Sequence, residues 1–329
     1  MNPILNFQER VFQVTPETFT GAAFDAFRLQ AEHCPVYNNF LQALDIHPDR
    51  VQSLSQLPFL PVELFKTKKI LTGNANTDFY FESSGTTSEI KSKHFVHDLT
   101  LYNKSIKTGF EFFFGDISDF CFLVLLPSYL ERNNASLVYM CEFLMQRSQH
   151  KNNGFYLYEY DKLISVLQEN ESKNTNTILI GVSFALLDLA EKFSLPLKNT
   201  IVMETGGMKG RREEITRREL HDILKKSFSV DTILSEYGMT ELLSQAYAKQ
   251  DGIFFTPPWM KILIRDPEDP FTILPAGKTG CINIIDLANI YSCCFIATQD
   301  LGKLNHDGSF EVLGRYDTGD IRGCNLMVE

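Results

Sequence analysis

Short apolar runs alternate with stretches of helical periodicity through the middle of the chain, and this alternation limits the possible folds more than any other feature. The segments, in order along the chain, are 120–126, 136–146, 155–158, 162–168, 177–180 and 199–203. Strands that alternate with helices are typical of an α/β fold whose sheet is covered by helices. We therefore predict an α/β fold.

The two ends of the chain follow other patterns. Apolar residues recur at helical spacing in the first fifty residues, as at Ala23, Phe27 and Ala31, which predicts a helical start. From Gly252 onward short strands are separated by turns such as Asp307-Gly308, which predicts a β-rich lobe. The chain has 329 residues without an internal repeat or a long linker, so we expect one compact unit with lobes.

Charge and cysteine usage narrow the possible partners and compartment. A net charge of -10 argues against a nucleic-acid partner, because such proteins need a basic face to neutralise phosphates. No apolar run reaches the roughly 20 residues that span a bilayer, and residues 1–10 lack the features of a secretory signal. The seven cysteines are odd in number and scattered, which indicates reduced thiols in the cytosol.

The first candidate site is Ser83-Ser84-Gly85-Thr86-Thr87-Ser88, with Lys91 and Lys93 shortly after it. Such a loop can surround phosphates with hydroxyls and backbone N–H groups, because glycine allows a close approach. It is not a Walker A loop, because no second glycine precedes a Lys-Ser or Lys-Thr pair. A polar turn that caps a helix is an equally good interpretation of the residues alone.

The second candidate site is Ser235-Glu236-Tyr237-Gly238-Met239-Thr240-Glu241. Tyr237 could stack on a purine and Thr240 could bond a phosphate oxygen. Glu241 could hold magnesium, which prefers hard oxygen ligands. The alternative is a strand-to-helix turn in which Thr240 or Ser235 is the cap.

The third candidate site joins residues 298–302 to residues 314–317 across a hairpin. Asp300 could accept hydrogen bonds from two ribose hydroxyls, and Arg315 could reach a phosphate or the ribose with its fork of donors. Solvated hairpin charges are the alternative for both residues.

These three segments, in this order, resemble the adenylate-forming superfamily of acyl-CoA synthetases and nonribosomal adenylation domains. Two further stretches resemble the acyl-protein synthetases of bacterial bioluminescence: Leu126–Arg132 with Ser136–Met140, and Glu204–Gly210. The resemblance implies an N-terminal adenylation core at residues 1–315, with two sheet-containing lobes and a β-rich lobe. A post-hinge tail at residues 316–329 would follow, without the lid domain of the wider superfamily.

The resemblance also implies a role for each matched residue, with ATP and Mg2+ as cofactors. Glu241 would hold the magnesium, Thr240 would bond the α-phosphate and Asp300 would grip the ribose. Arg315 belongs to the hinge motif and is a further cofactor-binding candidate. The residues placed around the phosphates are Ser83, Ser84, Gly85, Thr86 and Thr87, and those around the adenine are Gly206, Gly207 and Tyr237.

Cys324 in the tail is the candidate acyl acceptor. A thiolate can attack an acyl adenylate, and the neighbouring Arg322 would favour the charged form of the thiol. Cys324 could also simply pack as a small apolar residue. The resemblance favours the acceptor role, because acyl-protein synthetases carry their acyl group on a cysteine near the C-terminus.

We therefore expect an acid–thiol ligase. It would convert a carboxylic acid, expected to be a fatty acid, to acyl-AMP and then to an acyl-protein thioester. A reductase or another acyl acceptor would be the partner protein. Two alternatives stay open: a ligase that acts directly on coenzyme A or a carrier protein, and a nucleotide-binding subunit without catalysis.

Overall fold

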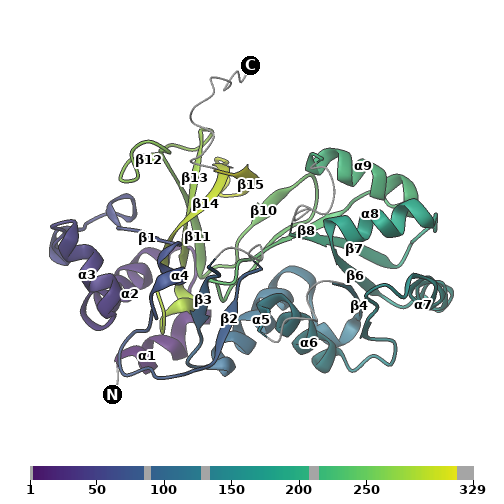
Figure 1. The fold of residues 1–329 in the computed structure, drawn as a ribbon, viewed down its shortest axis with the longest axis horizontal. Helices are drawn as coiled ribbons and strands as arrows, with labels where there is room; N and C mark the ends of the chain where they lie inside the picture. Colours follow the sequence, from purple (N-terminus) through teal and green to yellow (C-terminus); the bar gives the residue numbers. More distant parts are fainter. Residues whose placement is uncertain (1–2, 85–89, 127–133, 207–214, 317–329) are drawn as a thin grey trace.

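The computed structural model describes residues 3–84, 90–126, 134–206 and 215–316, and their strands form one large sheet and one small one (Figure 1). The large sheet runs in the order β12 (Ile273–Leu274), β11 (Met260–Arg265), β13 (Thr279–Asp286), β14 (Phe295–Leu304), β15 (Phe310–Arg315), β10 (Ile253–Phe255), β9 (Ala246–Ala248), β8 (Leu234–Tyr237), β7 (Thr200–Thr205), β6 (Thr177–Val182), β4 (Cys121–Leu125) and β5 (Gly154–Phe155). The short strand β1 (Leu60–Pro61) pairs with β14. The small sheet is the antiparallel pair β2 (Tyr80–Glu82) and β3 (Lys93–Phe95).

The strands β4 to β8 are parallel and form the α/β part that the sequence predicts. Every residue of β4 and β6 is buried, as expected for parallel strands covered on both faces. Helices α8 (Ser183–Lys192) and α9 (Arg217–Phe228) lie on one side of these strands in Figure 1, and α5 (Leu99–Phe114) and α6 (Ser136–Ser148) lie on the other. Helix α7 (Tyr160–Ser172) connects β5 to β6.

The carboxyl ends of β6, β7 and β8 lie at one edge of this parallel part. Ligands of open α/β sheets bind outside the carboxyl ends of the strands. The segments that follow β7 and β8 begin at Gly206 and Gly238, and both belong to the motifs recognised in the sequence. The fold therefore brings two predicted segments to the same edge.

The strands β9 to β15 pair with one another in antiparallel fashion and form the predicted β-rich part. Only the short β1 pairs with β14 in parallel among the described strands of this part. The β14–β15 hairpin turns at Asp307-Gly308, as the sequence predicts, and Gly308 has the positive φ of 86° that suits glycine. Strand β9 pairs with β8 on one side and β10 on the other. The expected lobes therefore share one continuous sheet among the described residues.

The chain starts with helices, as predicted: α1 (Pro3–Arg10), α2 (Phe19–His33) and α3 (Pro35–Ala43), followed by the short α4 (Leu64–Thr67). The short 3-10 helices are η1 (Val11–Gln13), η2 (Pro48–Arg50), η3 (Leu54–Gln56), η4 (Ile117–Asp119) and η5 (Leu287–Asn289). The Tyr37 ring stacks on the Phe295 ring with centroids 5.9 Å apart, and this contact packs α3 against β14. Aromatic contacts of this kind add about 0.5–1.5 kcal/mol to the burial of apolar area.

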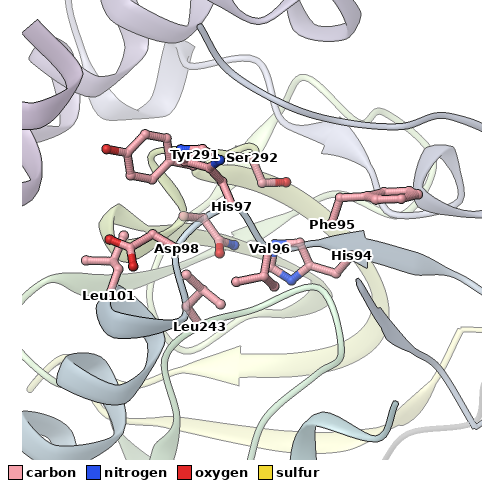
Figure 2. A pocket seen from close by; sticks show the side chains of 10 residues that line it. His94, Phe95, Val96, His97, Asp98, Leu101, Leu243, Tyr291 and Ser292 are labelled. Atoms are coloured by element: carbon pink, nitrogen blue, oxygen red, sulfur yellow. The ribbon is translucent and has the colours of Figure 1, made fainter. Parts of the chain in front are cut away.

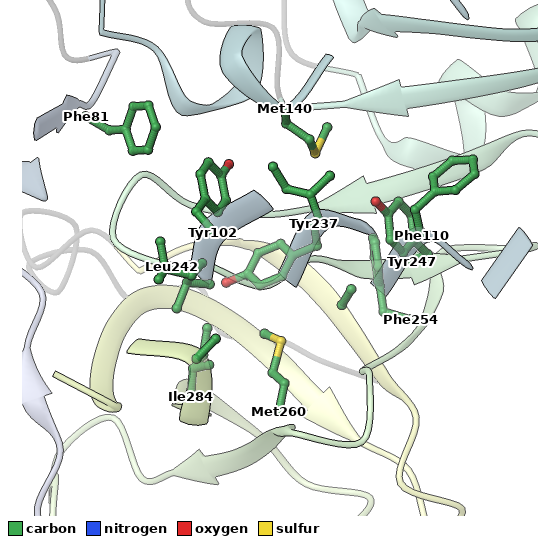
Figure 3. Packing of buried hydrophobic residues seen from close by; sticks show 14 of the residues in the cluster. Phe81, Tyr102, Phe110, Met140, Tyr237, Leu242, Tyr247, Phe254, Met260 and Ile284 are labelled. Atoms are coloured by element: carbon green, nitrogen blue, oxygen red, sulfur yellow. The ribbon is translucent and has the colours of Figure 1, made fainter. Parts of the chain in front are cut away.

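Large buried side chains join the parallel and antiparallel parts. Tyr102 and Phe110 from α5 lie near Tyr237 of β8 and Tyr247 of β9 in Figure 3, and all four are buried. They belong to one continuous apolar cluster, which agrees with the prediction of a single compact unit. No helix in the described ranges is long and apolar enough to cross a bilayer.

Candidate active site

Tyr237 and Asp300 are the first pair of predicted site residues that the fold brings together. The Tyr237 hydroxyl, at the end of β8, donates a hydrogen bond to Asp300 Oδ2 in β14 at 2.7 Å. Burial raises the pKa of the Asp300 carboxyl, although the Tyr237 hydroxyl and the Arg315 charge oppose this shift. The hydrogen bond fixes the β14–β15 hairpin against the carboxyl end of β8.

Arg315 lies directly opposite Asp300 in the β14–β15 ladder. Its Nε is 3.9 Å from Asp300 Oδ1, and its side chain is 80% exposed whereas that of Asp300 is 16% exposed. An exposed ion pair of this length contributes little to stability. The sequence alternative of a solvated hairpin charge therefore describes Arg315 in this structure but not Asp300.

Thr240 and Glu241 lie in the turn between β8 and β9, so the strand-to-helix alternative is wrong. His94 Nδ1 is 2.9 Å from the carbonyl oxygen of Thr240. Asn289 Nδ2 donates to the carbonyl oxygen of Glu241 at 2.8 Å. Both contacts hold the backbone of the motif from the side of the protein core.

The Glu241 carboxyl is buried, with 5% of the residue exposed. Burial raises its pKa, and a hydrogen bond from the Ser92 side chain is the largest opposing effect. A nearby cation would offset the cost of keeping this carboxylate charged. The described residues contain no group of three His, Cys, Asp or Glu side chains that could enclose a metal. A single buried carboxylate is compatible with Mg2+, which usually takes one or two carboxylates and completes its shell with phosphate oxygens and water.

Ser83 and Ser84 follow β2, and the chain returns as β3, so the predicted loop joins two antiparallel strands. The next described element is a strand, and the helix-cap alternative stays untested, because residues 85–89 lie outside the described residues. Ser83 N donates to Ser92 O at 3.0 Å, and Ser92 N donates to Ser83 Oγ at 2.9 Å. Gly85, Thr86 and Thr87 lie outside the described residues. The base of the loop is nevertheless placed beside Glu241, through Ser92.

Gly206 ends β7 at the same edge of the sheet. Its φ of 67° lies in the left-handed region that glycine adopts without strain. Its carbonyl oxygen accepts a hydrogen bond from Ser183 Oγ at 2.7 Å, which ties the end of β7 to the start of α8. Gly207 lies outside the described residues. Helix α9 begins at Arg217, because Thr216 is its N-cap.

Two buried glutamates beside the site were missed in the sequence. Glu204 of β7 contacts Arg217 Nε at 3.2 Å and His221 Nε2 at 3.7 Å. Burial would raise its pKa, but the hydrogen bond from His221 and the Arg217 charge lower it overall. Glu236 of β8 accepts a hydrogen bond from the Thr205 hydroxyl, and burial raises its pKa to about 7. The available sequence signal was an acidic residue one position before the end of each strand.

The cysteines of the described residues are all buried free thiols: Cys34, Cys121, Cys141, Cys281, Cys293 and Cys294. Burial raises the pKa of each thiol, to about 11 for Cys121. A thiol that stays protonated is a poor nucleophile. Cys281, Cys293 and Cys294 belong to the core, in agreement with the apolar residues around them in the sequence. Cys324 lies outside the described residues.

The fold is that of the adenylate-forming enzymes. The structure resembles 2-hydroxyisobutyryl-CoA ligase in complex with 2-HIB-AMP, with a TM-score of 0.64 and 12% identity over 93% of this chain and 70% of that one. It also resembles ATP-bound MatB from Rhodopseudomonas palustris, with a TM-score of 0.55 and 17% identity. That match covers 72% of this chain and 47% of the MatB chain, so this chain spans about half the length of MatB.

The chain belongs to the LuxE family of acyl-protein synthetases, whose family model matches residues 15–329. It is 22% identical to the long-chain-fatty-acid–luciferin-component ligase of Vibrio harveyi, over 89% of this chain and 82% of that protein. The ligase of the same name from Aliivibrio fischeri is also 22% identical, over 98% of this chain and 90% of that protein. The resemblance found in the sequence is confirmed. The chain is a ligase that forms acyl-AMP and transfers the acyl group to a thiol.

Proposed function

We propose that this enzyme uses ATP and Mg2+ to activate a long-chain fatty acid and then carries the acyl group on Cys324. The names of the curated relatives support the fatty acid. The observation that carries the site assignment is the meeting of three separate segments. The Tyr237–Asp300 hydrogen bond, the Thr240–Glu241 turn and the base of the Ser83 loop lie at one edge of the sheet.

In the first step a carboxylate oxygen of the acid attacks the α-phosphorus of ATP. A new P–O bond forms, and the bond to the leaving pyrophosphate breaks. The Thr240 hydroxyl would bond the α-phosphate, Asp300 would accept from the ribose hydroxyls, and Arg315 would reach the ribose or a phosphate. Bound Mg2+, held by Glu241, would neutralise phosphate charge. The protein contributes mainly positioning and preorganised charge.

The remaining nucleotide contacts are proposed from the family resemblance. Tyr237 and Gly206 would lie beside the adenine, together with Gly207. The phosphates would be enclosed by Ser83 and Ser84 with Gly85, Thr86 and Thr87. The backbone of such a loop offers N–H groups to an anion.

In the second step the Cys324 sulfur attacks the carbonyl carbon of acyl-AMP. A C–S bond forms, the C–O bond to AMP breaks, and the thiol proton is lost to solvent. The thioester then passes to a reductase or another acyl-accepting protein. Because the described cysteines are free thiols, we also place the enzyme in a reducing compartment such as the cytosol.

Replacement of Cys324 by alanine tests the acyl carrier. We expect Cys324→Ala to retain acid-dependent pyrophosphate–ATP exchange and to lose the covalent acyl-enzyme detected by intact-protein mass spectrometry. Cys281→Ala is the matched control, because Cys281 is buried in β13 and should leave both signals unchanged. A Cys324→Ala protein that still becomes acylated would place the acceptor elsewhere. Unchanged acyl-CoA formation without any acylated protein would favour a direct coenzyme A ligase.

A further inference from the structure

Two side chains outside the recognised motifs hold consecutive carbonyl groups of the Thr240–Glu241 turn. His94, in β3, reaches the Thr240 carbonyl at 2.9 Å, and Asn289, at the end of η5, reaches the Glu241 carbonyl at 2.8 Å. These contacts span 146 and 48 residues of sequence. Nothing in the local sequence of the turn supplies them.

His94 is fixed as a neutral donor. It is 1% exposed, and the Phe65 ring packs edge-on against it with centroids 5.7 Å apart. Burial lowers the pKa of His94 to about 4, so the ring is neutral at physiological pH. A carbonyl oxygen can only accept, so Nδ1 carries the proton.

Asn289 is fixed by the segment on which it lies. It is fully buried, and Asp286 caps η5 by accepting from Ala288 N at 3.1 Å. The same carboxylate accepts from Leu243 N at 2.9 Å and from the Ser244 hydroxyl at 2.6 Å. Asp286 therefore fastens η5 to the chain just beyond Glu241.

A small cavity lies beside these two side chains. It has a volume of about 10 Å³, and its lining includes His94, Leu243, Asn289 and Ser292. Figure 2 views it from close by, with His94, Leu243 and Ser292 among the labelled side chains. Within the described residues, Asn289 Oδ1 and Ser292 Oγ are buried without a hydrogen-bond partner. A cavity of this size has room for about one water.

Anchoring two successive carbonyls orients the peptide groups on both sides of Glu241. The backbone between Thr240 and Glu241 then has little freedom left to lose when a ligand binds. Misplacement of a reacting group by about 1 Å can cost about 100-fold in rate. The turn carries both the proposed phosphate ligand and the proposed magnesium ligand, so its position matters for the reaction.

We propose that His94 and Asn289 are positioning residues for adenylation, which hold the Thr240–Glu241 turn in the geometry that phosphate and magnesium require. This inference rests on the roles proposed above for Thr240 and Glu241. Neither side chain touches the substrate in this account. Each acts through the backbone carbonyl that it binds.

Substitutions at His94 separate the hydrogen bond from simple packing. Asparagine places an N–H close to the position of Nδ1, whereas glutamine places its amide near Nε2 and alanine has no donor. We expect His94→Gln and His94→Ala to lower kcat of pyrophosphate–ATP exchange by about 10- to 100-fold and to raise the Mg2+ concentration needed for half-maximal rate. His94→Asn should stay within about threefold of wild type, because it keeps the donor. Asn289→Asp should resemble His94→Ala, since it removes the donor to Glu241.

A matched control removes another buried hydrogen bond that does not involve the turn. Tyr37→Phe loses the bond from the Tyr37 hydroxyl to Pro58 O at 2.6 Å and should lower Tm without changing the Mg2+ requirement. The inference is overturned if His94→Ala and His94→Gln keep wild-type kcat and Mg2+ requirement. It is also overturned if His94→Asn loses as much activity as His94→Ala at equal Tm.

A second measurement distinguishes a failure of the positioning role from a failure of the proposed function. The rise in Tm caused by ATP with Mg2+ reports binding alone. If wild type shows exchange with an acid, equal activity in His94→Ala contradicts only the positioning role. If wild type shows no exchange with any acid, the proposed function fails, and the Tm rise still decides the inference. A rise that is smaller in His94→Ala than in His94→Asn supports it, and equal rises contradict it.

Discussion

The carboxyl ends of β7 and β8 and the β14–β15 hairpin both bring carboxylates to the site. The two regions differ in the partners that these carboxylates have within the protein. At the strand ends, Glu204 is paired with Arg217 and His221, and Glu236 is bonded by Thr205. On the hairpin, Asp300 has the Tyr237 hydroxyl and only a long contact to the exposed Arg315. The strand ends satisfy their carboxylates within the protein, whereas the hairpin leaves donors and acceptors for a ligand. Glu204 and Glu236 therefore stabilise the fold, whereas Asp300 is available to bind a ligand.

Substitutions of Glu204 or Glu236 should therefore appear mainly in the free energy of unfolding. Substitutions on the hairpin should appear mainly in the KM for ATP, with little change in stability.

The largest effect is expected from Glu236→Gln, as a change in the pH dependence of stability. Because burial raises the folded pKa of Glu236 from 4.5 to about 7, the folded state holds the proton more tightly. Wild-type stability should therefore fall as pH rises from about 4.5 through about 7, by on the order of 3 kcal/mol. Glutamine stays neutral and should remove this loss. Urea unfolding at several pH values measures the free energy of unfolding of both proteins. The same pH dependence in wild type and in Glu236→Gln would contradict the role of Glu236 in stability.

Arg217→Met should destabilise the protein by about 2 kcal/mol, less than the roughly 3–5 kcal/mol of a fully buried pair, because Arg217 is 32% exposed. The variant leaves the Glu204 carboxylate without its cation and loses the hydrogen bond from Arg217 to Val312 O at 2.9 Å. Urea unfolding at neutral pH is the measurement. Arg218→Met on the exposed side of α9 is the control and should have no comparable effect. Equal stabilities for the two variants would refute the role of the pair.

Asp300→Asn should raise the KM for ATP by about 10-fold or more, because a hydrogen bond to a charged acceptor contributes about 1.5–3 kcal/mol. The asparagine side chain can still accept from the Tyr237 hydroxyl, so the free energy of unfolding should change by less than about 0.5 kcal/mol. Steady-state exchange kinetics and urea unfolding test the two halves of this prediction. Asp307→Asn at the hairpin turn is the control for KM. A destabilised Asp300→Asn protein with a wild-type KM for ATP would show that Asp300 stabilises the fold and does not bind the ligand.

The smallest effect is expected from Arg315→Ala, which removes an exposed side chain. Stability should change by less than about 0.5 kcal/mol. The KM for ATP should rise about threefold, which corresponds to about 0.6 kcal/mol, and the rise should shrink at high salt because exposed charges are screened. Arg315→Lys should recover part of the change. A KM that is insensitive to both substitutions would remove Arg315 from the site.

The local parts of the fold were predictable from the sequence. Apolar runs such as 120–126 and 177–180 became the buried strands β4 and β6, because continuous apolar runs suit strands covered on both faces. The Asp307-Gly308 turn was predictable because glycine accepts a positive φ. The hairpin brings Asp300 and Arg315 onto neighbouring strands, but the register shift between Leu301 and Gly302 sets their pairing.

The long-range contacts were not predictable. His94 and Asn289 contact the Thr240–Glu241 turn from distant segments, and no local pattern reports such a contact. Glu204 and Arg217 become an ion pair only because α9 packs beside the end of β7. The strand-to-helix alternative for Thr240 failed for the same reason, because the pairing of β8 with β9 decided the conformation. The domain boundary at residue 315 and the role of Cys324 stay predictions.

Pyrophosphate–ATP exchange with purified protein and Mg2+ tests the central claim most directly. The acids would be fatty acids of increasing chain length, with aromatic acids and amino acids for comparison. The account predicts exchange that requires Mg2+ and that long-chain fatty acids stimulate far more than the other acids. Absence of exchange with every acid, under conditions where ATP raises the Tm, would contradict it.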